Sequence, residues 1–206
     1  MTKKELCIAL SRLRMFENPE VRSEQYSTDS EVAGDALWKA HMLGDIDGKA
    51  VVDLGAGTGI LGLGACFLGA KKAFLVEKDK AALEIAAENK KLLEKEAGRK
   101  LNADMINEDV FAFEKQADVV FMNPPFGTKD AGADTRFLLL AFKLAPVVYS
   151  FHKSSTRKYI DKLASENGFF VTHYFEYDFP LKNTMAFHRK RIERVRVGFW
   201  RMEKKQ

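Results

Sequence analysis

Residues 51–62 read VVDLGAGTGILG, and this stretch decides the fold. An apolar run ends at Asp53 and Leu54, three glycines follow in steps of two, and a second apolar run begins at Ile60. Apolar runs bounded by turn residues predict here a buried strand, a tight turn and a buried helix. Glycine permits a positive φ and leaves no Cβ in the way of a ligand. The stretch therefore predicts a strand–turn–helix unit whose turn can lie against a small molecule.

The same alternation of strand and helix patterns continues after this unit. Repeated units of this kind predict a doubly wound α/β sandwich, in which ligands bind beyond the carboxyl ends of parallel strands. The last two β-rich segments have no evident helix between them, so we expect them to form an antiparallel pair at the end of a seven-stranded, mostly parallel sheet. The predicted strands are 49–54, 73–76, 102–107, 119–122, 147–150, 169–179 and 191–202. The predicted helices of this part are 60–68, 80–95, 137–144 and 156–167.

The first 48 residues carry a different pattern. Helices are predicted at 3–14 and 30–43, with a loop between them. One domain is the usual expectation for a chain of 206 residues. We therefore expect a single domain, in which residues 1–48 form a helical N-terminal extension and residues 49–206 form the core.

The composition excludes several classes of protein. With 46% hydrophobic and 30% charged residues, the chain is too apolar to be an extended disordered chain. No apolar run approaches the roughly 18 residues that a membrane span needs, and Ser11, Arg12 and Arg14 interrupt the first one too early for a secretory signal. Cys7 and Cys66 are the only cysteines, which favours neither a disulfide framework nor a zinc cluster. We expect a cytoplasmic protein with no membrane partner and no bound metal.

The net charge of +4 is concentrated at the C-terminus. Residues 181–206 carry nine basic and two acidic side chains, whereas residues 1–48 are net acidic and the middle of the chain is balanced. A block of this kind is either the solvated surface of a strand or an electrostatic footprint for a polyanion such as RNA.

An acidic residue lies where a nucleoside would need it. Glu77 ends the second predicted strand, 22 residues after Gly55, and a carboxylate at this place can accept hydrogen bonds from both hydroxyls of a ribose. The glycines run in steps of two, so they do not form the GxGxxG pattern of dinucleotide-binding folds. A glycine turn alone can be purely structural. The turn together with the acidic strand end indicates a nucleoside site.

Asn123, Pro124, Pro125 and Phe126 directly follow the predicted strand 119–122. Two prolines stiffen the backbone, so the Asn123 side chain and the Pro124 carbonyl can be held as acceptors around one point. An exocyclic amine offers two N–H donors, and accepting both orients its lone pair toward a methyl group and supports the developing positive charge. Phe126 can stack on a nucleobase, a contact of roughly 1–3 kcal/mol. The alternative is that the two prolines merely end a strand.

Residues 53–59 together with Glu77 resemble the Rossmann-like class I methyltransferases that use S-adenosylmethionine. This resemblance implies that the glycine turn backs the amino-acid part of the cofactor and that Glu77 holds its ribose. It also implies that Asp109 accepts a hydrogen bond from the adenine amino group while Val110 covers the ring. The pattern at 123–126 resembles that of methyltransferases acting on adenine N6, cytosine N4 or a glutamine amide.

Three strings make the resemblance more specific. Residues 24–28 (EQYST), 123–129 (NPPFGTK) and 149–157 (YSFHKSSTR) look like the methyltransferase-like protein five family. That family places an N6-methyl group on one adenosine of small-subunit ribosomal RNA, and the match runs from about Leu13 to Trp200. The resemblance therefore implies an RNA partner, and it suggests a small activator protein that pairs with an edge of the sheet.

The residues expected to form the site fall into three groups. The catalytic group is Asn123, Pro124, Pro125 and Phe126. The residues expected to bind S-adenosylmethionine are Gln25, Thr28, Asp53, Gly55, Gly57, Thr58, Ile60, Glu77, Asp109, Val110 and Asn123. The residues expected to contact RNA phosphates near the base pocket are Lys129, Lys153, Arg157, Arg189, Lys190 and Arg191.

Three functions remain open on the sequence alone. The leading hypothesis is an RNA adenine-N6 methyltransferase that extrudes its target base from the stack. The first alternative is a protein glutamine N5-methyltransferase, in which a peptide loop occupies the same site. The second is a non-catalytic module that binds the cofactor or RNA. His152 can be read either as a group that titrates near neutrality or as a structural histidine.

Overall fold

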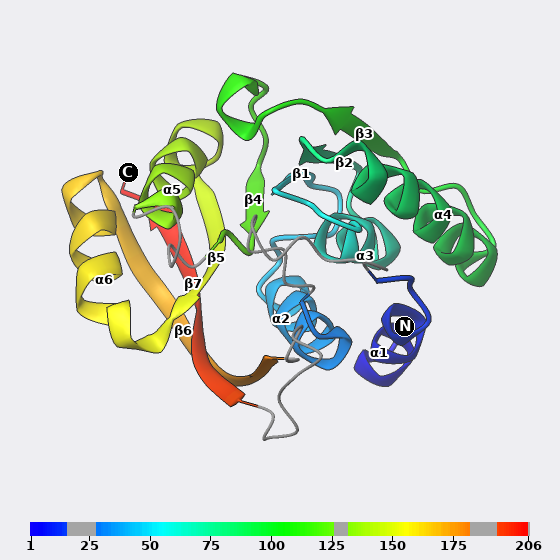
Figure 1. The fold of residues 1–206 in the computed structure, drawn as a ribbon, viewed down its shortest axis with the longest axis horizontal. Coiled ribbons are helices and arrows are strands. Elements are labelled where there is room, and N and C mark those ends of the chain that lie inside the picture. The colour runs from blue at the N-terminus through cyan, green and yellow to red at the C-terminus, as the bar shows by residue number, and fades with distance from the viewer. Residues whose placement is uncertain (16–27, 126–131, 182–192, 206) are drawn as a thin grey trace, which may run out of the picture.

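The computed structural model describes residues 1–15, 28–125, 132–181 and 193–205 (Figure 1). The strands are β1 (Ala50–Leu54), β2 (Lys72–Glu77), β3 (Ala103–Asn107), β4 (Val119–Met122), β5 (Val147–Lys153), β6 (Phe169–Leu181) and β7 (Glu193–Lys204). The helices are α1 (Lys3–Ser11), α2 (Ser30–Met42), α3 (Ile60–Leu68), α4 (Lys80–Ala97), α5 (Ala133–Leu144) and α6 (Arg157–Glu166). The described residues also include the short 3₁₀ turns η2 (Val110–Ala112) and η3 (Ser154–Thr156).

The strands form one seven-stranded sheet in the order β3-β2-β1-β4-β5-β7-β6. Strands β1 to β5 are parallel, and β7 pairs antiparallel with both β5 and β6. The predicted fold class is therefore confirmed. Strand β5 runs three residues beyond the predicted 147–150, because β7 supplies partners as far as Lys153, which pairs with Val197.

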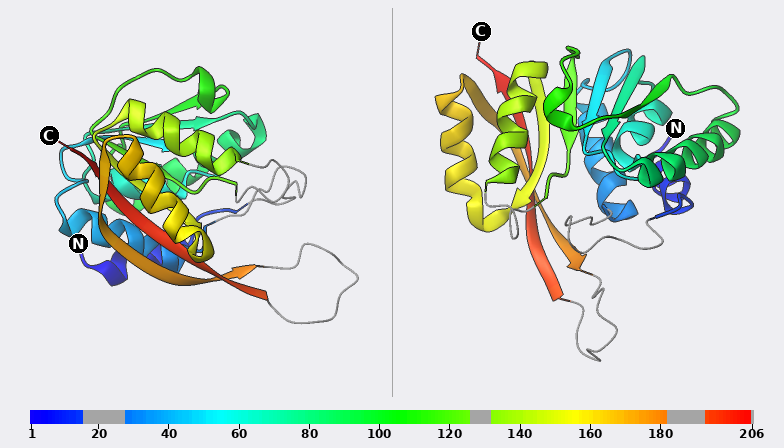
Figure 2. Two further views of the ribbon diagram at one scale, coloured as in Figure 1. Left: turned by 90° about the vertical axis from the view of Figure 1, so that its left-hand side faces the viewer. Right: turned by 45° about the horizontal axis from the view of Figure 1, so that its top comes forward.

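The sheet separates two apolar cores. Successive residues of a strand point to opposite faces, and Val51 and Val52 of β1 accordingly belong to different cores. Helices α1, α2, α3 and α4 cover one face, and α5 and α6 cover the other (Figures 1 and 2). This layering is the doubly wound arrangement, in which the central strands β1, β4 and β5 are almost entirely buried.

Helices α3 and α4 differ in burial, and their sequences explain the difference. All nine residues of α3 are buried, and Cβ atoms added to Gly62 and Gly64 would lie 2.9 Å from Leu75 and 2.5 Å from Leu37. The glycines thus let α3 pack closely between the sheet and α2. Helix α4 is amphipathic and begins at Asp79, whose side chain accepts from two backbone N–H groups. No helix in the described ranges has the length and apolar character needed to cross a membrane.

Helix α5 begins four residues earlier than the predicted 137–144. Gly132 precedes it in a left-handed conformation, with φ of 79°. The first turn contains Asp134, which the helix dipole favours at this end and whose carboxylate accepts from the Thr135 N–H. An apolar pattern does not detect a polar first turn, and this explains the short prediction.

The first helix shows the opposite error, since α1 ends at Ser11 although 3–14 was predicted. Its start is well defined by a capping box. The Glu5 N–H donates to the Thr2 hydroxyl, and the Thr2 N–H donates to the Glu5 carboxylate. Leu13 lies beyond the helix but is still buried, so an apolar residue outside the helix prolonged the predicted pattern.

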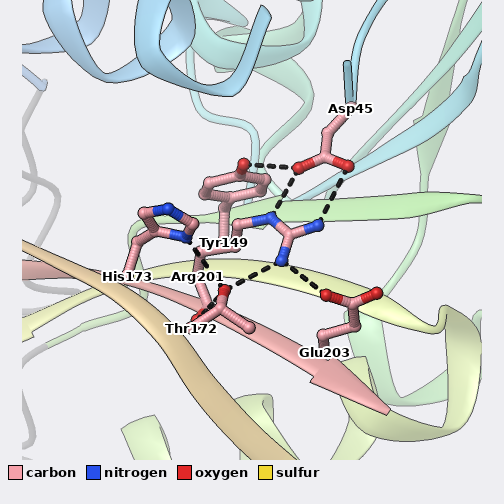
Figure 3. Close-up of polar contacts among 6 residues, drawn as sticks. All are labelled: Asp45, Tyr149, Thr172, His173, Arg201 and Glu203. Atoms are coloured by element: carbon pink, nitrogen blue, oxygen red, sulfur yellow. Dashed lines mark hydrogen bonds and ion pairs between the residues drawn. The ribbon is translucent and has the colours of Figure 1, made fainter. Parts of the chain in front are cut away.

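A buried ion pair fixes the end of the N-terminal extension to the sheet (Figure 3). Asp45, between α2 and β1, accepts from the Tyr149 hydroxyl at 2.6 Å and from Arg201 Nε and Nη2 at 2.7 and 3.2 Å. The third nitrogen of Arg201 donates to Thr172 and Glu203. Burial and Asp45 both raise the pKa of Tyr149, which stays a donor. Every nitrogen of the guanidinium is thus paired inside the fold.

Candidate cofactor and catalytic site

The strand order places two predicted motifs side by side. Strands β2 and β3 are added to the sheet on one side of β1, and β4 and β5 are added on the other side. In folds of this kind, ligands usually bind where the strand order reverses in this way. Leu54 and Met122, the last residues of these strands, are in register. Gly55 and Asn123 therefore leave neighbouring strands at the same level, so the glycine turn and the Asn-Pro-Pro string begin side by side at the carboxyl edge of the sheet.

The glycine turn is held by the adjacent strand. Gly55, Gly57 and Gly59 have φ of 70°, 54° and 86°, a region in which a side chain is strained. The Gly55 N–H donates to the Val76 carbonyl at 2.9 Å. The Gly57 N–H donates to the Glu77 carboxylate at 3.0 Å. These two hydrogen bonds tie the backbone of the turn to the end of β2.

Glu77 has a second role that the sequence did not reveal. One carboxylate oxygen accepts from Gly57, and the other accepts from the Asp79 N–H at 2.9 Å. The side chain is only half-buried, and each carboxylate oxygen has a further lone pair. Glu77 can thus accept ribose hydroxyls, as predicted, while it also fixes the turn on which the rest of the cofactor would lie.

Asp53 is the buried carboxyl at the end of β1. It is 2% exposed, and its Oδ2 accepts from the Gly62 N–H at 2.7 Å. Burial raises the pKa of Asp53 to about 7, Glu77 adds to the rise, and the Gly62 hydrogen bond opposes it. A cationic group bound nearby would favour the ionised form. S-adenosylmethionine carries an ammonium group, so this carboxyl fits the predicted cofactor.

Apolar groups surround the place expected for adenine. Asp109 is exposed and its carboxylate accepts from the Phe111 N–H, whereas Val110 is buried. The Phe111 ring meets the Phe137 ring of α5 edge to face, with centroids 5.5 Å apart. A Cβ on Gly55 would lie 3.3 Å from the Phe137 ring. Phe137, which the sequence did not single out, therefore lies directly over the glycine turn.

Thr58 and Ile60 are buried in the turn and at the start of α3. The Thr58 carbonyl accepts from the Asn89 side chain at 2.9 Å. Asn89, which is fully buried, also exchanges hydrogen bonds with the backbone N–H and carbonyl of Arg14. Asn89 thus ties the N-terminal extension to the glycine turn. Its only sequence signal was an amide on the inner face of an amphipathic helix.

Asn123 carries an acceptor without a donor. Its Nδ2 donates to the Thr28 hydroxyl at 3.0 Å. Its Oδ1 is buried, and no described residue donates to it. Buried acceptors in native structures are normally paired, so an unpaired one at a ligand-binding edge requires an explanation. The predicted chemistry supplies it, because an amine substrate would donate to this oxygen.

His152 is buried. Its Nε2 lies 2.7 Å from the Ser150 hydroxyl, its Nδ1 lies 3.7 Å from Asp134, and its ring meets Trp200 edge to face. Burial lowers the pKa of His152, although Asp134 opposes this. These contacts support the structural interpretation of His152 over that of a titrating base.

Two of the predicted phosphate contacts lie at the edge of the sheet where the parallel strands end. Lys153 ends β5 and is half-buried, and Arg157 begins α6 and is exposed. The Arg157 guanidinium lies 4.0 Å from the centre of the Tyr174 ring and 3.8 Å from Asp161. Both cations are therefore near the end of β5, beside the strand that leads to Asn123.

The strand pair β6–β7 continues past this edge. Lys153 and Tyr177 are both in register with Val197, so the residues of β7 before Val197 extend beyond the end of β5 (Figure 2). Exposed Arg196 belongs to this projection. The predicted site residues that fall outside the described ranges are Gln25, Phe126, Lys129, Arg189, Lys190 and Arg191. Within those ranges, no cluster of three or more His, Cys, Asp or Glu side chains is arranged to hold a metal.

Comparisons with known proteins agree with this geometry. The family described as Conserved hypothetical protein 95 matches residues 32–165, more than half of the chain. The rRNA N(6)-adenosine-methyltransferase Mettl5 of Drosophila melanogaster is 39% identical over 198 residues, which cover 91% of this chain and 90% of the fly protein. A solved structure of a proposed RNA methyltransferase from Pyrococcus horikoshii has a TM-score of 0.87 and 44% identity, over 99% of this chain and 98% of that one.

A protein of the glutamine-modifying class is also similar, over a shorter stretch. It is a proposed protein N5-glutamine methyltransferase of Methanocaldococcus jannaschii, 31% identical over 97 residues. The match covers 47% of this chain and 46% of that protein. Similarity to the rRNA enzyme thus extends over almost the whole chain, whereas similarity to the glutamine enzyme extends over about half.

Proposed function

This chain belongs to the methyltransferase-like protein five family of rRNA N6-adenosine methyltransferases, and from this premise we propose that it methylates adenine N6 in small-subunit ribosomal RNA. It is an S-adenosylmethionine-dependent RNA methyltransferase. The observation that carries the proposal is the buried Oδ1 of Asn123, to which no described residue donates. It lies one residue beyond β4, level with the glycine turn.

The chemistry asks little of the protein beyond positioning. S-adenosylmethionine supplies a methyl group on a positively charged sulfur, ready for attack by a nucleophile. Asn123 Oδ1 and the Pro124 carbonyl would accept the two N6 hydrogens, directing the nitrogen lone pair at the methyl carbon. As the N–C bond forms and the C–S bond breaks, N6 becomes positive and both hydrogen bonds strengthen. The N6 proton then leaves to water, so the transfer needs no protein base.

The target adenosine must leave its stack to reach this point. An enzyme that modifies a base extrudes it into a pocket, because a stacked base does not expose its amine to an in-line methyl group. We propose that Phe126 then stacks on the extruded adenine. The loop that begins with Asn123 leaves the sheet where the strand order reverses, which gives the base an open approach.

Cations around the crevice would hold the RNA backbone. Lys153 and Arg157 lie at the edge that carries Asn123, and β7 carries Arg196 beyond it. We propose that the C-terminal basic block, including Arg189, Lys190 and Arg191, extends this surface. Such contacts read phosphates rather than bases, so they favour RNA without selecting a sequence.

Two alternatives use the same geometry. A glutamine side chain also offers an NH₂ group to two acceptors, which keeps a protein glutamine N5-methyltransferase as the first alternative. The half-chain similarity to a proposed enzyme of that class supports it less than the full-length similarity supports an RNA substrate. A non-catalytic binding module is the second alternative, and the unpaired Asn123 oxygen weighs against it.

We also propose a partner and a location. A small activator protein would pair with one of the outer strands of the sheet, β3 or β6, whose outward edges face no other strand of the sheet described here. Because the proposed substrate is ribosomal RNA, the proposed location is the cytoplasm.

The deciding experiment offers both substrates to the enzyme. In vitro, the enzyme and labelled S-adenosylmethionine are mixed with unmodified small-subunit rRNA and, separately, with a release-factor-like protein. In a second experiment, N6-methyladenosine is mapped in the rRNA of cells with and without the enzyme. We expect the label at one adenosine, absent when the Asn123→Ala variant replaces the wild type. Label in the protein substrate alone would contradict the proposal and support the glutamine alternative.

A further inference from the structure

We propose that Thr28 is a positioning residue for Asn123. Its hydroxyl holds the Asn123 carboxamide in the orientation that presents Oδ1 to the amine being methylated. This inference rests on the proposed function and deepens it. It gives Thr28 a role beyond the cofactor contact that the family resemblance implies.

The two ends of an asparagine side chain are not equivalent. The oxygen only accepts hydrogen bonds, and the NH₂ group only donates them. In the structure the Nδ2 of Asn123 donates to Thr28 Oγ1 at 3.0 Å, and Oδ1 is left as a buried acceptor. Turning the amide by 180° would place two N–H donors where the substrate amine must itself donate. Only the observed orientation can therefore accept from the substrate.

The productive orientation needs an acceptor for its NH₂ group. Thr28 is 5% exposed, so water is largely excluded from replacing its hydroxyl. Without that hydroxyl, the productive orientation would leave a buried donor unpaired, which is costly. With the hydroxyl present and the substrate amine bound, both ends of the Asn123 amide are paired. Thr28 thus keeps the reactive arrangement fully paired. In the reversed arrangement the hydroxyl would donate to Oδ1 instead, and the two N–H donors of Asn123 would face the N–H donors of the substrate amine.

The start of helix α2 fixes the position of Thr28. It directly precedes Asp29, whose side chain caps α2 by accepting from the N–H groups of Glu31 and Val32. Helix α2 is anchored in the core beneath the sheet by its buried residues Ala33, Ala36, Leu37 and Ala40. A partner 95 residues away in the chain therefore holds the Asn123 amide from a rigid helix start.

The test removes the hydroxyl while keeping the shape of the side chain. Thr28→Val should lower the single-turnover rate of RNA methylation by roughly tenfold, the effect of one buried hydrogen bond. Thr28→Ser restores the hydroxyl and should recover most of this loss. As a matched control, Thr2→Val removes the cap of α1 in the same extension and should leave the rate unchanged.

A double-mutant cycle separates positioning from other roles. On an Asn123→Ala background, Thr28→Val should change the rate by less than about twofold, because no amide remains to be oriented. Calorimetry measures any change in cofactor affinity of Thr28→Val separately, and the rates are compared at saturating S-adenosylmethionine, where weaker cofactor binding no longer lowers the rate. A full loss on the Asn123→Ala background would overturn the proposal, as would a loss explained entirely by weaker cofactor binding.

A spectroscopic measurement does not depend on activity. The side-chain NH₂ signal of Asn123 can be assigned by its absence from Asn123→Ala in ¹⁵N-correlated spectra. We expect slow exchange of one amide proton in wild type and Thr28→Ser, and fast exchange in Thr28→Val. Equal exchange in all three would refute the positioning role. Absence of RNA methylation by wild type, with the protected proton present, would instead refute the proposed function alone.

Discussion

Two of the polar contacts that join the N-terminal extension to the sheet differ in how completely their groups are paired. In the first, both oxygens of Asp45 accept, and all three nitrogens of Arg201 donate (Figure 3). In the second, Thr28 accepts from Asn123, whose oxygen has no donor among the described residues. The saturated contact can only hold the fold, whereas the unsaturated one keeps an acceptor for a ligand.

Their positions in the sheet explain the difference. Asp45 precedes β1 and meets Tyr149 near the beginning of β5, at the amino ends of the parallel strands. Asn123 follows β4, at the carboxyl ends, where sheets of this topology bind ligands. The N-terminal extension thus contacts the sheet at both ends of the parallel strands, through Asp45 at the amino ends and through Thr28 at the carboxyl ends.

The largest expected effect tests the saturated contact. Asp45→Ala leaves a buried guanidinium with fewer partners, and we expect a loss of about 3–5 kcal/mol in the free energy of unfolding. Urea denaturation measures this loss. The exposed neighbour Asp47 provides the control, and Asp47→Ala should change stability by less than about 0.5 kcal/mol. Equal, small effects of both variants would remove the structural role of the Asp45 network.

Asp53 lies between these two cases, because it is a buried carboxyl with one hydrogen-bond donor and a raised pKa. Its folded pKa is raised to about 7, whereas an unfolded Asp ionises near pH 4. Between these values the unfolded state has already lost the proton that the native state retains, so stability falls as the pH rises. Relative to Asp53→Asn, wild type should lose up to about 1.4 kcal/mol per pH unit over this window, and nothing more above it.

Urea denaturation of both proteins from pH 4 to pH 8 tests this expectation. The Asn side chain keeps the size of Asp53 and does not titrate, so the difference between the two curves isolates one group. A difference that stays constant with pH would show that Asp53 is ionised throughout.

Asn123→Ala tests the unsaturated contact and should show the opposite signature to Asp45→Ala. We expect kcat and kcat/KM to fall together by roughly 10²–10³, because the lost acceptor acts in the transition state. Stability should fall by only about 1 kcal/mol, because the substitution removes one hydrogen bond to Thr28 together with an acceptor that was already unpaired. Single-turnover methylation with checked cofactor occupancy measures the effect. Asn167→Ala, at the end of α6, is the control.

The smallest of the four effects concerns the cofactor side of the crevice. Glu77→Ala should weaken S-adenosylmethionine binding at least about tenfold, through loss of the ribose contacts and of the Gly57 hydrogen bond that shapes the turn. Isothermal calorimetry measures this affinity, with exposed Glu84→Ala as the control. Unchanged affinity in the Glu77 variant would return Glu77 to a structural role.

Much of the fold followed from local patterns. Helix α3 and strand β4 begin and end where predicted, because each is a short apolar run with clear limits. Glycines flank α3, and β4 lies between Asp118 and the Asn-Pro-Pro string. The errors arose where another segment decides the boundary. Strand β5 extends to Lys153 because β7 pairs with it, and α5 includes a polar first turn that no apolar pattern marks.

The site divides in the same way. The glycine turn was recognisable from spacing within one strand–turn–helix unit, and Glu77 from its place at the next strand end. Asn89 and Phe137 were not recognised as part of the site. Asn89 donates to the Thr58 carbonyl, and the Phe137 ring lies over Gly55. Their roles depend on neighbours that lie far away along the chain.

The sequence by itself determined which chemistry is available: a glycine turn, an acidic strand end and an amide stiffened by two prolines, each encoded within a few consecutive residues. Only the tertiary structure decided how these groups are paired. In the tertiary structure the Asn123 nitrogen donates to Thr28, so the Asn123 oxygen stays available to a ligand, and Asp45 is paired with Arg201. Hydrogen bonding depends on distances of about 3 Å between groups that packing brings together, and separation along the chain does not report those distances.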